Sequence, residues 1–337
     1  GRAKRAAQGG RSRTRRTEPS PGVQLVSPLL IPGAGSSPER SFNRRRLLSA
    51  VQPLIGDGRP LILWIYTPAH LTNDLIGALD EDLCIYHCTQ HHAGRPHAPA
   101  RTPELERRIV SRADLVIADG ILLYEERERL HPRVYRIPSG VDSDSLAETE
   151  PASWAGGMPR PIVGYMGSID HRIDPDLIAA AARAHPEWSF VAVGPIVDID
   201  VSALSALPNV ALLGQVPISE VPRALAAFDV GIMPYATIET TRYPYPAKLH
   251  QYLAAGLPIV STPLPDLEEF ADLVHQASTA TDFVTQIEQA LAAPRHAPKR
   301  RAVASEHTWA ARAEAISTLI SAHLEGNPPP SSPDFRA

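Results

Sequence analysis

The most informative segment of the chain reads Tyr245-Pro-Ala-Lys-Leu-His-Gln-Tyr-Leu-Ala-Ala-Gly-Leu-Pro-Ile-Val-Ser-Thr-Pro-Leu264. Pro246 suits a first helical turn, because its ring presets φ and its missing N–H is not needed there. Gly256 is a typical residue for ending that helix. The apolar pair 259–260 then begins a short buried strand, which the following prolines stop. The segment therefore predicts a helix followed by a strand, with Leu249, Tyr252 and Leu253 on one helix face.

Lys248 lies in the first turn of this predicted helix. A helix N-terminus that opens onto a loop attracts anions, because its free N–H groups and its dipole both present positive charge. The chain has only three lysines, so one placed here favours phosphate binding over a solvated side chain. We therefore expect a phosphate-binding segment.

Composition limits the classes of protein that the chain can belong to. The 337 residues are enough for two domains, with 43% hydrophobic and 21% charged residues. The net charge of −4 gives no global field that would recruit nucleic acid. Two cysteines are too few for a secreted disulfide scaffold, and no apolar run reaches the length of a membrane helix or a signal peptide. We expect a cytoplasmic protein.

Short apolar strands alternate with helical patterns along almost the whole chain. This alternation predicts α/β architecture with two doubly wound, Rossmann-like domains in tandem. Predicted strands are 23–26, 61–65, 83–86, 115–118, 134–137, 161–167, 189–193, 210–213, 230–233 and 258–261. Predicted helices are 44–51, 72–79, 103–112, 120–130, 174–184, 219–227, 246–255, 281–292 and 308–324. We expect a disordered basic arm over 1–20, domains over 21–150 and 161–325 joined by a linker at 143–160, and a disordered tail over 326–337.

Several stretches of the second half follow one another in a familiar order. They are Gly164-Tyr-Met-Gly-Ser-Ile169, Pro186-Glu-Trp-Ser-Phe-Val-Ala-Val-Gly-Pro195, Leu207-Pro-Asn-Val-Ala-Leu-Leu-Gly214, Phe228-Asp-Val-Gly-Ile-Met-Pro-Tyr235 and Pro246 to Val260. In this order they resemble the donor-binding domain of retaining GT-B-fold glycosyltransferases, of the group 1 or family 4-like type. In the first half, 112–118 and 137–142 resemble the end of the acceptor domain of that family.

The resemblance implies transfer of a hexose from a nucleotide diphosphate sugar to a hydroxyl group of a polysaccharide or lipid-linked acceptor, with retention. It implies no cofactor and no metal. Stabilisation of the leaving diphosphate by preorganised dipoles and cations would then be the main catalytic effect.

The resemblance also assigns roles to individual residues. Arg172, Lys248 and Glu239 become the candidate catalytic residues, with Glu239 facing the donor sugar. The remaining donor-binding candidates are Gly167, Ser168, Gly194, Pro195, Gln215, Val216, Arg242, Tyr243 and Gln251. Each has an ordinary structural explanation as well, such as a strand-to-helix turn for the glycines and a solvated loop acid for Glu239.

Two positions depart from the family pattern. Gln251 stands where the family commonly has a glutamate that grips the ribose hydroxyls, and Tyr243 stands where an earlier glutamate is common. Glutamine can still donate and accept hydrogen bonds, but without charge-assisted strength. These departures keep open an alternative from another class, a degenerate GT-B domain that binds a nucleotide sugar or a partner without turnover.

The segment Cys84-Ile-Tyr-His-Cys-Thr-Gln-His-His92 contains the residue types that bind zinc. Its Cys-x3-Cys spacing is not a usual structural zinc pattern, and Cys84 belongs to a predicted strand, so we expect a small buried side chain there. We instead expect His87 and His91 to lie on the acceptor side of the site.

The N-terminus carries seven basic residues and no acid within the first 16 residues. Such an arm could hold the protein at an anionic membrane surface, at ~1 kcal/mol per basic residue near that surface. The first predicted strand comes late, so we also expect an abbreviated or truncated acceptor domain. The partners implied are a nucleotide sugar and a glycan or lipid-linked acceptor.

Overall fold

The computed structural model describes residues 14–32, 37–56, 58–146, 149–292, 298–328 and 330. Within it the chain divides into two compact units. The first comprises Gly1–His87 with Ala98–Val116, and the second comprises Cys88–His97 with Ile117–Ala337.

The first unit contains a two-stranded ribbon, helices and the start of a four-stranded sheet of order β3-β4-β5-β6. Its elements are β1 (Arg15–Ser20), β2 (Val23–Ser27), α1 (Ser37–Val51), η2 (Gln52–Leu54), β3 (Ile62–Ile65), α2 (His70–Leu75), β4 (Leu83–Cys88) and α3 (Thr102–Arg112). β1 and β2 pair antiparallel, whereas β3 and β4 pair in parallel. Strand β3 is an edge strand in this order.

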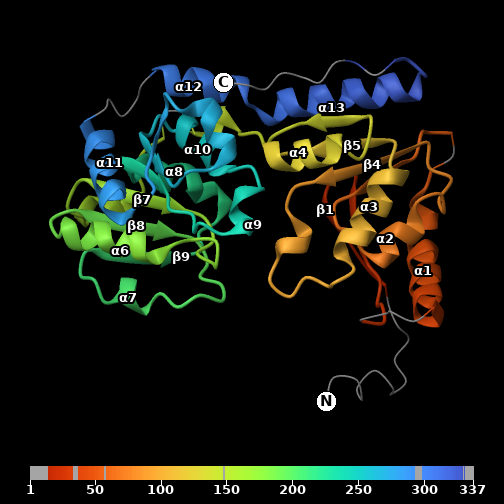
Figure 1. Ribbon diagram of the computed structural model, residues 1–337, viewed down its shortest axis with the longest axis horizontal. Coiled ribbons are helices and arrows are strands. Elements are labelled where there is room, and N and C mark those ends of the chain that lie inside the picture. The colour runs from red at the N-terminus through yellow and green to blue at the C-terminus, as the bar shows by residue number, and fades with distance from the viewer. Residues whose placement is uncertain are drawn as a thin grey trace, which may run out of the picture. The chain divides into compact units, whose positions relative to one another are not determined.

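Helix α2 lies between α1 and α3 (Figure 1), and an arginine from each of these helices contacts it. Arg40 on α1 places Nη2 2.6 Å from a carboxylate oxygen of Asp74. Arg112 on α3 donates to the carbonyl groups of Asn73 and Ile76. Because these carbonyls lie at the C-terminal end of α2, they would otherwise lack helical partners.

The second unit is built on a six-stranded sheet of order β12-β11-β10-β7-β8-β9, in which each strand pairs in parallel with its neighbours. The strands of this sheet are β7 (Ile162–Met166), β8 (Ser189–Val193), β9 (Val210–Gly214), β10 (Val230–Met233), β11 (Ile259–Ser261) and β12 (Val274–Gln276). The second unit also contains β6 (Val134–Arg136) and the last two residues of β5 (Leu115–Ala118), which belong to the four-stranded sheet. Its α-helices are α4 (Ile121–Glu128), α5 (Ser143–Leu146), α6 (Pro175–Ala184), α7 (Ser202–Ser205), α8 (Val221–Ala227), α9 (Glu239–Arg242), α10 (Lys248–Ala254), α11 (Ala280–Ala292), α12 (Pro298–Glu306) and α13 (Trp309–Leu324). Short 3-10 helices are η3 (His92–Gly94), η4 (Ser153–Gly157), η5 (Ile218–Glu220) and η6 (Pro265–Phe270).

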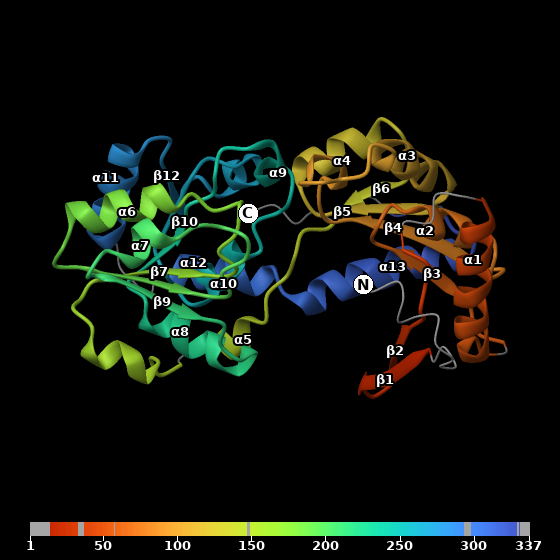
Figure 2. The same ribbon diagram turned by 90° about the horizontal axis from the view of Figure 1, so that it is seen from below.

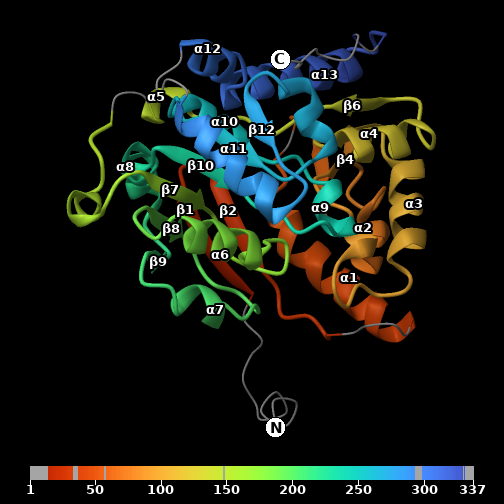
Figure 3. The ribbon, with the colours of Figure 1, turned by 60° about the vertical axis from the view of Figure 1, so that its left-hand side comes forward.

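Both faces of the six-stranded sheet are covered, so its central strands are apolar along their whole length. Ile162 and Met166 of β7 join the core that contains α8 and α10. Val163 and Tyr165, which alternate with them, join the core that contains α6 and α11. Figure 2 shows α6 and α11 on one side of the strands and α8 on the other, and Figure 3 shows α6 and α11 side by side in front of the sheet.

Two glycines let large aromatic rings lie directly on the sheet. A Cβ on Gly164 of β7 would stand 2.1 Å from the ring of Phe228, and one on Gly231 of β10 would stand 2.6 Å from the ring of Tyr252. Both rings are fully buried. The packing of the α8 and α10 layer therefore requires glycine at these two positions.

Most predicted elements are confirmed to within a few residues, but some expectations were wrong. The predicted strand 23–26 forms a ribbon with Arg15–Ser20 instead of joining a parallel sheet, so residues 15–20 of the expected arm are a strand. Residues 1–13 and most of the expected tail lie outside the described residues. The predicted linker contains α5 and η4, and the sequence did not predict β12 or α12.

The compact units do not follow the predicted boundary at residues 151–160, because residues 117–146 contact the C-terminal half of the chain. Arg136 pairs with Asp266 and Glu269, and Val141 exchanges backbone hydrogen bonds with the 307–309 segment. None of the helices within the described ranges combines the length and the apolar run that crossing a bilayer requires.

Gly164→Ala is expected to lower the free energy of unfolding by about 1–3 kcal/mol, because the added methyl group overlaps the Phe228 ring. Gly157→Ala is the matched control, since a Cβ there meets nothing within 4 Å. Chemical denaturation of both variants measures the difference. Equal stability of the two would contradict the packing described above.

Candidate functional site

The loops that follow β7 and β8 meet at the carboxyl edge of the sheet, where open parallel sheets bind ligands. Gly167 directly follows β7 with a φ of 138°, and Gly194 directly follows β8 with a φ of 151°. A Cβ on Gly194 would stand 2.1 Å from the carbonyl oxygen of Gly167. Only glycine allows this backbone-to-backbone contact, so both predicted glycines lie where the sequence placed them.

Lys248 is the first residue of α10, and its side chain lies against Gly167. A Cβ on Gly167 would stand 2.3 Å from Cε and 2.8 Å from Nζ of Lys248. The ammonium group also lies 5.4 Å from the ring centre of Tyr165 and 5.6 Å from that of Tyr235, within the range of cation–π contacts. These contacts fix a cation over the glycine loop.

A buried tyrosine holds α10 in this position. The backbone N–H of Met166 donates to the Tyr252 hydroxyl at 2.9 Å, and that hydroxyl donates to the carbonyl of Ile232 at 3.2 Å. Tyr252 lies four residues after Lys248 in the helix, so the two side chains share a face. The helix itself begins at Lys248, so Pro246 precedes it instead of lying in its first turn.

Arg172 lies in the same glycine loop, but its charge is paired. Its Nε and Nη2 donate to the two carboxylate oxygens of Asp170, at 2.9 and 2.6 Å. Burial alone would raise the pKa of Asp170, but the hydrogen bonds from Arg172 outweigh that effect and lower the pKa. Asp170 was not predicted as a site residue, although its place two residues before Arg172 is a signal for such a pair. Arg172 therefore presents an oriented, partly neutralised guanidinium group.

A cavity of about 620 Å³ opens beside Arg172 in the second unit. It is lined by Gln90, His91, Arg95, Pro96, His97, Asp170, His171, Arg172, Val197, Asp198, Thr240 and Pro244. Its wall brings together two predicted site residues, Arg172 and His91, which are far apart in sequence. Convergent polar groups around one cavity are the usual form of a small-molecule site.

His91 is fixed in this wall by its neighbours. Its ring packs against that of Tyr243 at a tilt of 30°, with ring centres 4.2 Å apart, and Nδ1 lies 3.7 Å from the Glu239 carboxylate. The Tyr243 hydroxyl donates to Glu126 of α4 at 2.8 Å. Thr240, which also lines the cavity, has a buried hydroxyl oxygen without a hydrogen-bond partner among the described residues. Tyr243 thus braces the histidine at the position where the family commonly has an acid.

His87 does not join His91. It belongs to the first unit, where it contacts the rings of Trp64 and Tyr66. Burial lowers the pKa of His87 to about 4, so its imidazole is neutral at neutral pH. The sequence placed both histidines on the acceptor side, and this role stays a prediction for each.

The remaining donor candidates do not line the cavity, and of these Ser168 and Pro195 are bonded within the glycine loop. The Ser168 carbonyl accepts a hydrogen bond from the Tyr165 hydroxyl at 2.8 Å, and the Pro195 carbonyl accepts one from the Ile169 N–H at 2.9 Å. Gln251 is half-buried on α10, one turn after Lys248. The other three candidates differ in exposure: Gln215 and Arg242 are exposed, and Val216 packs against the core.

A buried group of acids behind the site was missed by the sequence reading. The carboxylate of Asp266 accepts hydrogen bonds from the Ile121 N–H and from Arg136, both at 2.9 Å. Burial raises the pKa of Asp266 to about 6. Burial and the charge of Asp266 together raise the pKa of Asp119 well above its ordinary value. Backbone N–H groups of Gly120 and Tyr245 donate to Asp119, which links this group to the segment before Lys248.

The residues that the structure describes contain no group of three His, Cys, Asp or Glu side chains placed to hold a metal ion. Cys84 and Cys88 are buried free thiols, as expected for Cys84.

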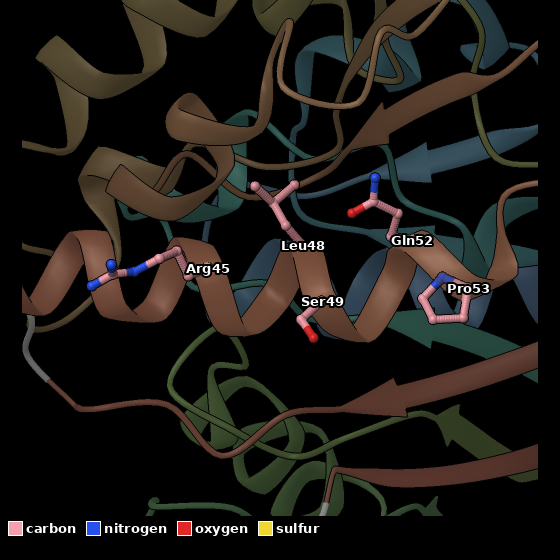
Figure 4. A pocket seen from close by; sticks show the side chains of 5 residues that line it. All are labelled: Arg45, Leu48, Ser49, Gln52 and Pro53. Atoms are coloured by element: carbon pink, nitrogen blue, oxygen red, sulfur yellow. The ribbon is translucent and has the colours of Figure 1, made fainter.

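A second hollow, in the first unit, has a different character (Figure 4). Its lining comes from the end of α1 and from η2, and consists of Arg45, Leu48, Ser49, Gln52 and Pro53. We do not assign this hollow as the functional site, because its lining comes from one short stretch of chain with a single charged side chain. No polar groups from other parts of the described chain converge on it.

Comparison with known proteins gives relatives in sequence and in fold. Residues 160–293 match the family described as "Glycosyl transferases group 1". A Bacillus subtilis (strain 168) protein named as a glycosyltransferase of teichuronic acid biosynthesis, TuaH, is 30% identical over 239 residues, covering 65% of this chain. The chain spans 59% of the length of that relative.

Solved structures share the fold. Sucrose-phosphate synthase from Thermosynechococcus elongatus superimposes with a TM-score of 0.71 at 16% identity, covering 93% of this chain and 86% of that one. Anabaena HepE, solved in complex with UDP, gives a TM-score of 0.61 at 17% identity, covering 85% and 82%. The predicted GT-B fold class is confirmed, and residues 160–293 carry a glycosyl transferases group 1 region.

Asp119→Asn is expected to reduce the pH dependence of stability. A carboxyl whose folded pKa is raised stabilises the fold below its ordinary value of 3.8 and loses that contribution as pH rises through the raised pKa. Asparagine mimics the protonated acid, so the variant should equal or exceed the parent in Tm at neutral pH. Thermal unfolding across acid to neutral pH, with the exposed Asp144→Asn as control, measures this. A large loss of Tm at neutral pH would show that Asp119 is needed as a charge.

Proposed function

We propose that this protein is a glycosyltransferase that moves a hexose from a nucleotide diphosphate sugar to a hydroxyl group of a polysaccharide or lipid-linked acceptor, with retention and without a metal. The observation that carries the proposal is the contact of Lys248 with Gly167 at the carboxyl end of β7. This contact lies inside the region that matches the glycosyl transferases group 1 family. The named relative and the UDP-bound neighbour support the same class of reaction.

The residues around the glycine loop have different roles in the proposed reaction. The diphosphate lies over Gly167 and Ser168, where Lys248 and Arg172 offset the negative charge that develops as the sugar–phosphate bond breaks. The acceptor oxygen forms a new bond to the same sugar carbon, and the proton of its hydroxyl passes to the departing diphosphate. Asp170 keeps the Arg172 guanidinium in one orientation, so less reorganisation is needed during the reaction.

The sugar and base are assigned to the surrounding loops. Glu239 and His91 face the sugar, with Tyr243 bracing His91 and Arg242 following on the same short helix. Gln251 takes the ribose hydroxyls, and the loops at Gly194-Pro195 and Gln215-Val216 take the base. In the cell we place the protein in the cytoplasm, with peripheral attachment to anionic membrane through its basic N-terminus.

The second candidate function is a degenerate GT-B protein that binds a nucleotide sugar or a partner without turnover. Gln251 and Tyr243, which replace two common acids, favour it. Release of free nucleotide from a bound nucleotide sugar, measured with and without acceptor, distinguishes the two functions.

The decisive experiment is a thermal-shift panel of UDP, GDP, ADP and dTDP and their sugars, run both with and without EDTA. A ligand that binds only the folded state raises Tm, so one nucleotide series should shift it and thereby name the base. No shift with any member, in protein that unfolds cooperatively, would refute the proposed donor site. A shift that EDTA abolishes would refute metal independence.

Lys248→Ala should weaken nucleotide-sugar binding or lower turnover by at least about tenfold, because it removes the cation over the glycine loop. Lys299→Ala is the matched control, since Lys299 pairs with Asp272 on the surface. Both variants are compared by donor titration and initial rates. Parental kinetics in Lys248→Ala would remove Lys248 from the diphosphate site.

Gln251→Glu should maintain or strengthen nucleotide-sugar binding, because a carboxylate accepts stronger hydrogen bonds from ribose hydroxyls than an amide does. Isothermal titration of the variant with the nucleotide found above measures the change. A tenfold or greater loss of affinity, about 1.4 kcal/mol, would mean that the ribose lies elsewhere.

A further inference from the structure

Three aromatic side chains gather on one face at the carboxyl end of β3 and β4. Trp64 pairs in register with Ile85, so their side chains share a face of the sheet. Tyr66 and His87 each follow two residues later and continue on that face. The ring centres of Trp64 and Tyr66 are 6.3 Å apart, and those of Tyr66 and His87 are 5.0 Å apart. We call Trp64, Tyr66 and His87 the aromatic platform.

The platform differs from an ordinary buried aromatic cluster in two respects. Tyr66 remains 51% exposed at the ligand-binding edge of a parallel sheet. In addition, the indole Nε1 of Trp64 and Nδ1 of His87 are buried without hydrogen-bond partners among the described residues. On the opposite face Tyr86 has its hydroxyl satisfied by Glu106 of α3 at 2.6 Å. Unpaired buried polar atoms are costly, so two together call for an explanation.

We propose that the aromatic platform binds a sugar ring of the acceptor, with the ring's C–H face on Tyr66 and its hydroxyl groups on Trp64 Nε1 and His87 Nδ1. The proposal rests on the glycosyltransferase function proposed above and specifies its acceptor as a carbohydrate.

The chemistry of the three side chains fits an uncharged, hydroxyl-rich ligand. The negative face of an aromatic ring attracts the weakly positive C–H bonds of a pyranose, whereas an anion would be repelled. Trp64 Nε1 can only donate a hydrogen bond. His87 is neutral because burial lowers its pKa to about 4, so it offers one donor and one acceptor nitrogen.

Access to the two nitrogens depends on Tyr66. Its side chain follows the last residue of β3 and packs against the rings of both Trp64 and His87. Because the ring is half exposed, it can turn without disturbing the sheet. In the proposed complex that rotation opens the indole and imidazole nitrogens to the sugar hydroxyls, which supply the hydrogen bonds that no described residue provides.

The test uses the full chain, labelled with nitrogen-15, and the indole N–H signal of Trp64. The signal is identified by its absence in Trp64→Phe, since the chain has four tryptophans. Methyl glucoside, N-acetylglucosamine and N-acetylgalactosamine are titrated without any nucleotide, with glycerol phosphate as a non-sugar probe. We expect at least one sugar to shift the Trp64 signal saturably, and glycerol phosphate to leave it unchanged.

Variants of Tyr66 complete the test. Tyr66→Ala should weaken sugar binding about tenfold, whereas Tyr66→Phe should keep it, because the stacking ring remains. Trp309→Ala, which removes an exposed aromatic residue from α13, is the matched control and should change nothing. The nucleotide-induced Tm shift should be the same in all three variants, which also shows that they are folded.

The possible outcomes separate this inference from the proposed function. A nucleotide shift without any sugar effect at Trp64, or with equal sugar binding in Tyr66→Ala, would overturn the platform and leave the glycosyltransferase proposal standing. A sugar effect that Tyr66→Ala removes, in protein that no nucleotide stabilises, would support the platform and overturn the donor site.

Discussion

The two hydrogen bonds of the Tyr252 hydroxyl determine where the cation of the site stands. They join α10 to the end of β7 through Met166 and to β10 through Ile232. The ring of Tyr252 can reach that point only because Gly231 has no side chain. One turn before Tyr252, the same helix places Lys248 on Gly167. Buried, apolar packing thus fixes the position of the Lys248 ammonium group before a ligand binds. Little conformational entropy is then lost on binding.

The electrostatics of the site follow from which cations are already paired. Two N–H groups of Arg172 donate to Asp170, so its guanidinium group is oriented. The negative charge of Asp170 also offsets part of the positive charge of Arg172. Lys248 is surrounded by the rings of Tyr165 and Tyr235, which attract an ammonium group without neutralising it. In the proposed donor site, a diphosphate would therefore meet the oriented guanidinium group of Arg172 and the full positive charge of Lys248. Such a division suits a leaving group whose charge rises during the reaction.

The sequence could predict the sheet and the glycine loop because both depend on local patterns. Buried parallel strands are apolar runs such as 162–166 and 189–193, and glycines after them indicate tight turns. Short or exposed elements were not predicted, because the three residues of β12 and the polar residues of β1 show no hydrophobic periodicity. The residues that come together in the cavity wall were not predicted for another reason. The contact of His91 with Glu239, and that of Asp119 with Asp266, joins residues about 147 positions apart, and no single-sequence signal encodes such a distance.

The buried acids give the segment before Lys248 a chemical link to the rest of the unit. Tyr245 donates its N–H to Asp119, and the Tyr243 carbonyl lies so near Gly120 that a Cβ there would stand 2.0 Å away. Asp266 in turn holds the N–H of Ile121 and the guanidinium of Arg136. Ionising Asp119 beside Asp266 would place two like charges in a buried space, which favours keeping one proton between them. The close packing of Gly120 against the Tyr243 carbonyl places these acids next to the segment that leads into α10. The position of Lys248 at the start of α10 thus depends on the packing of this segment as well as on the Tyr252 hydroxyl.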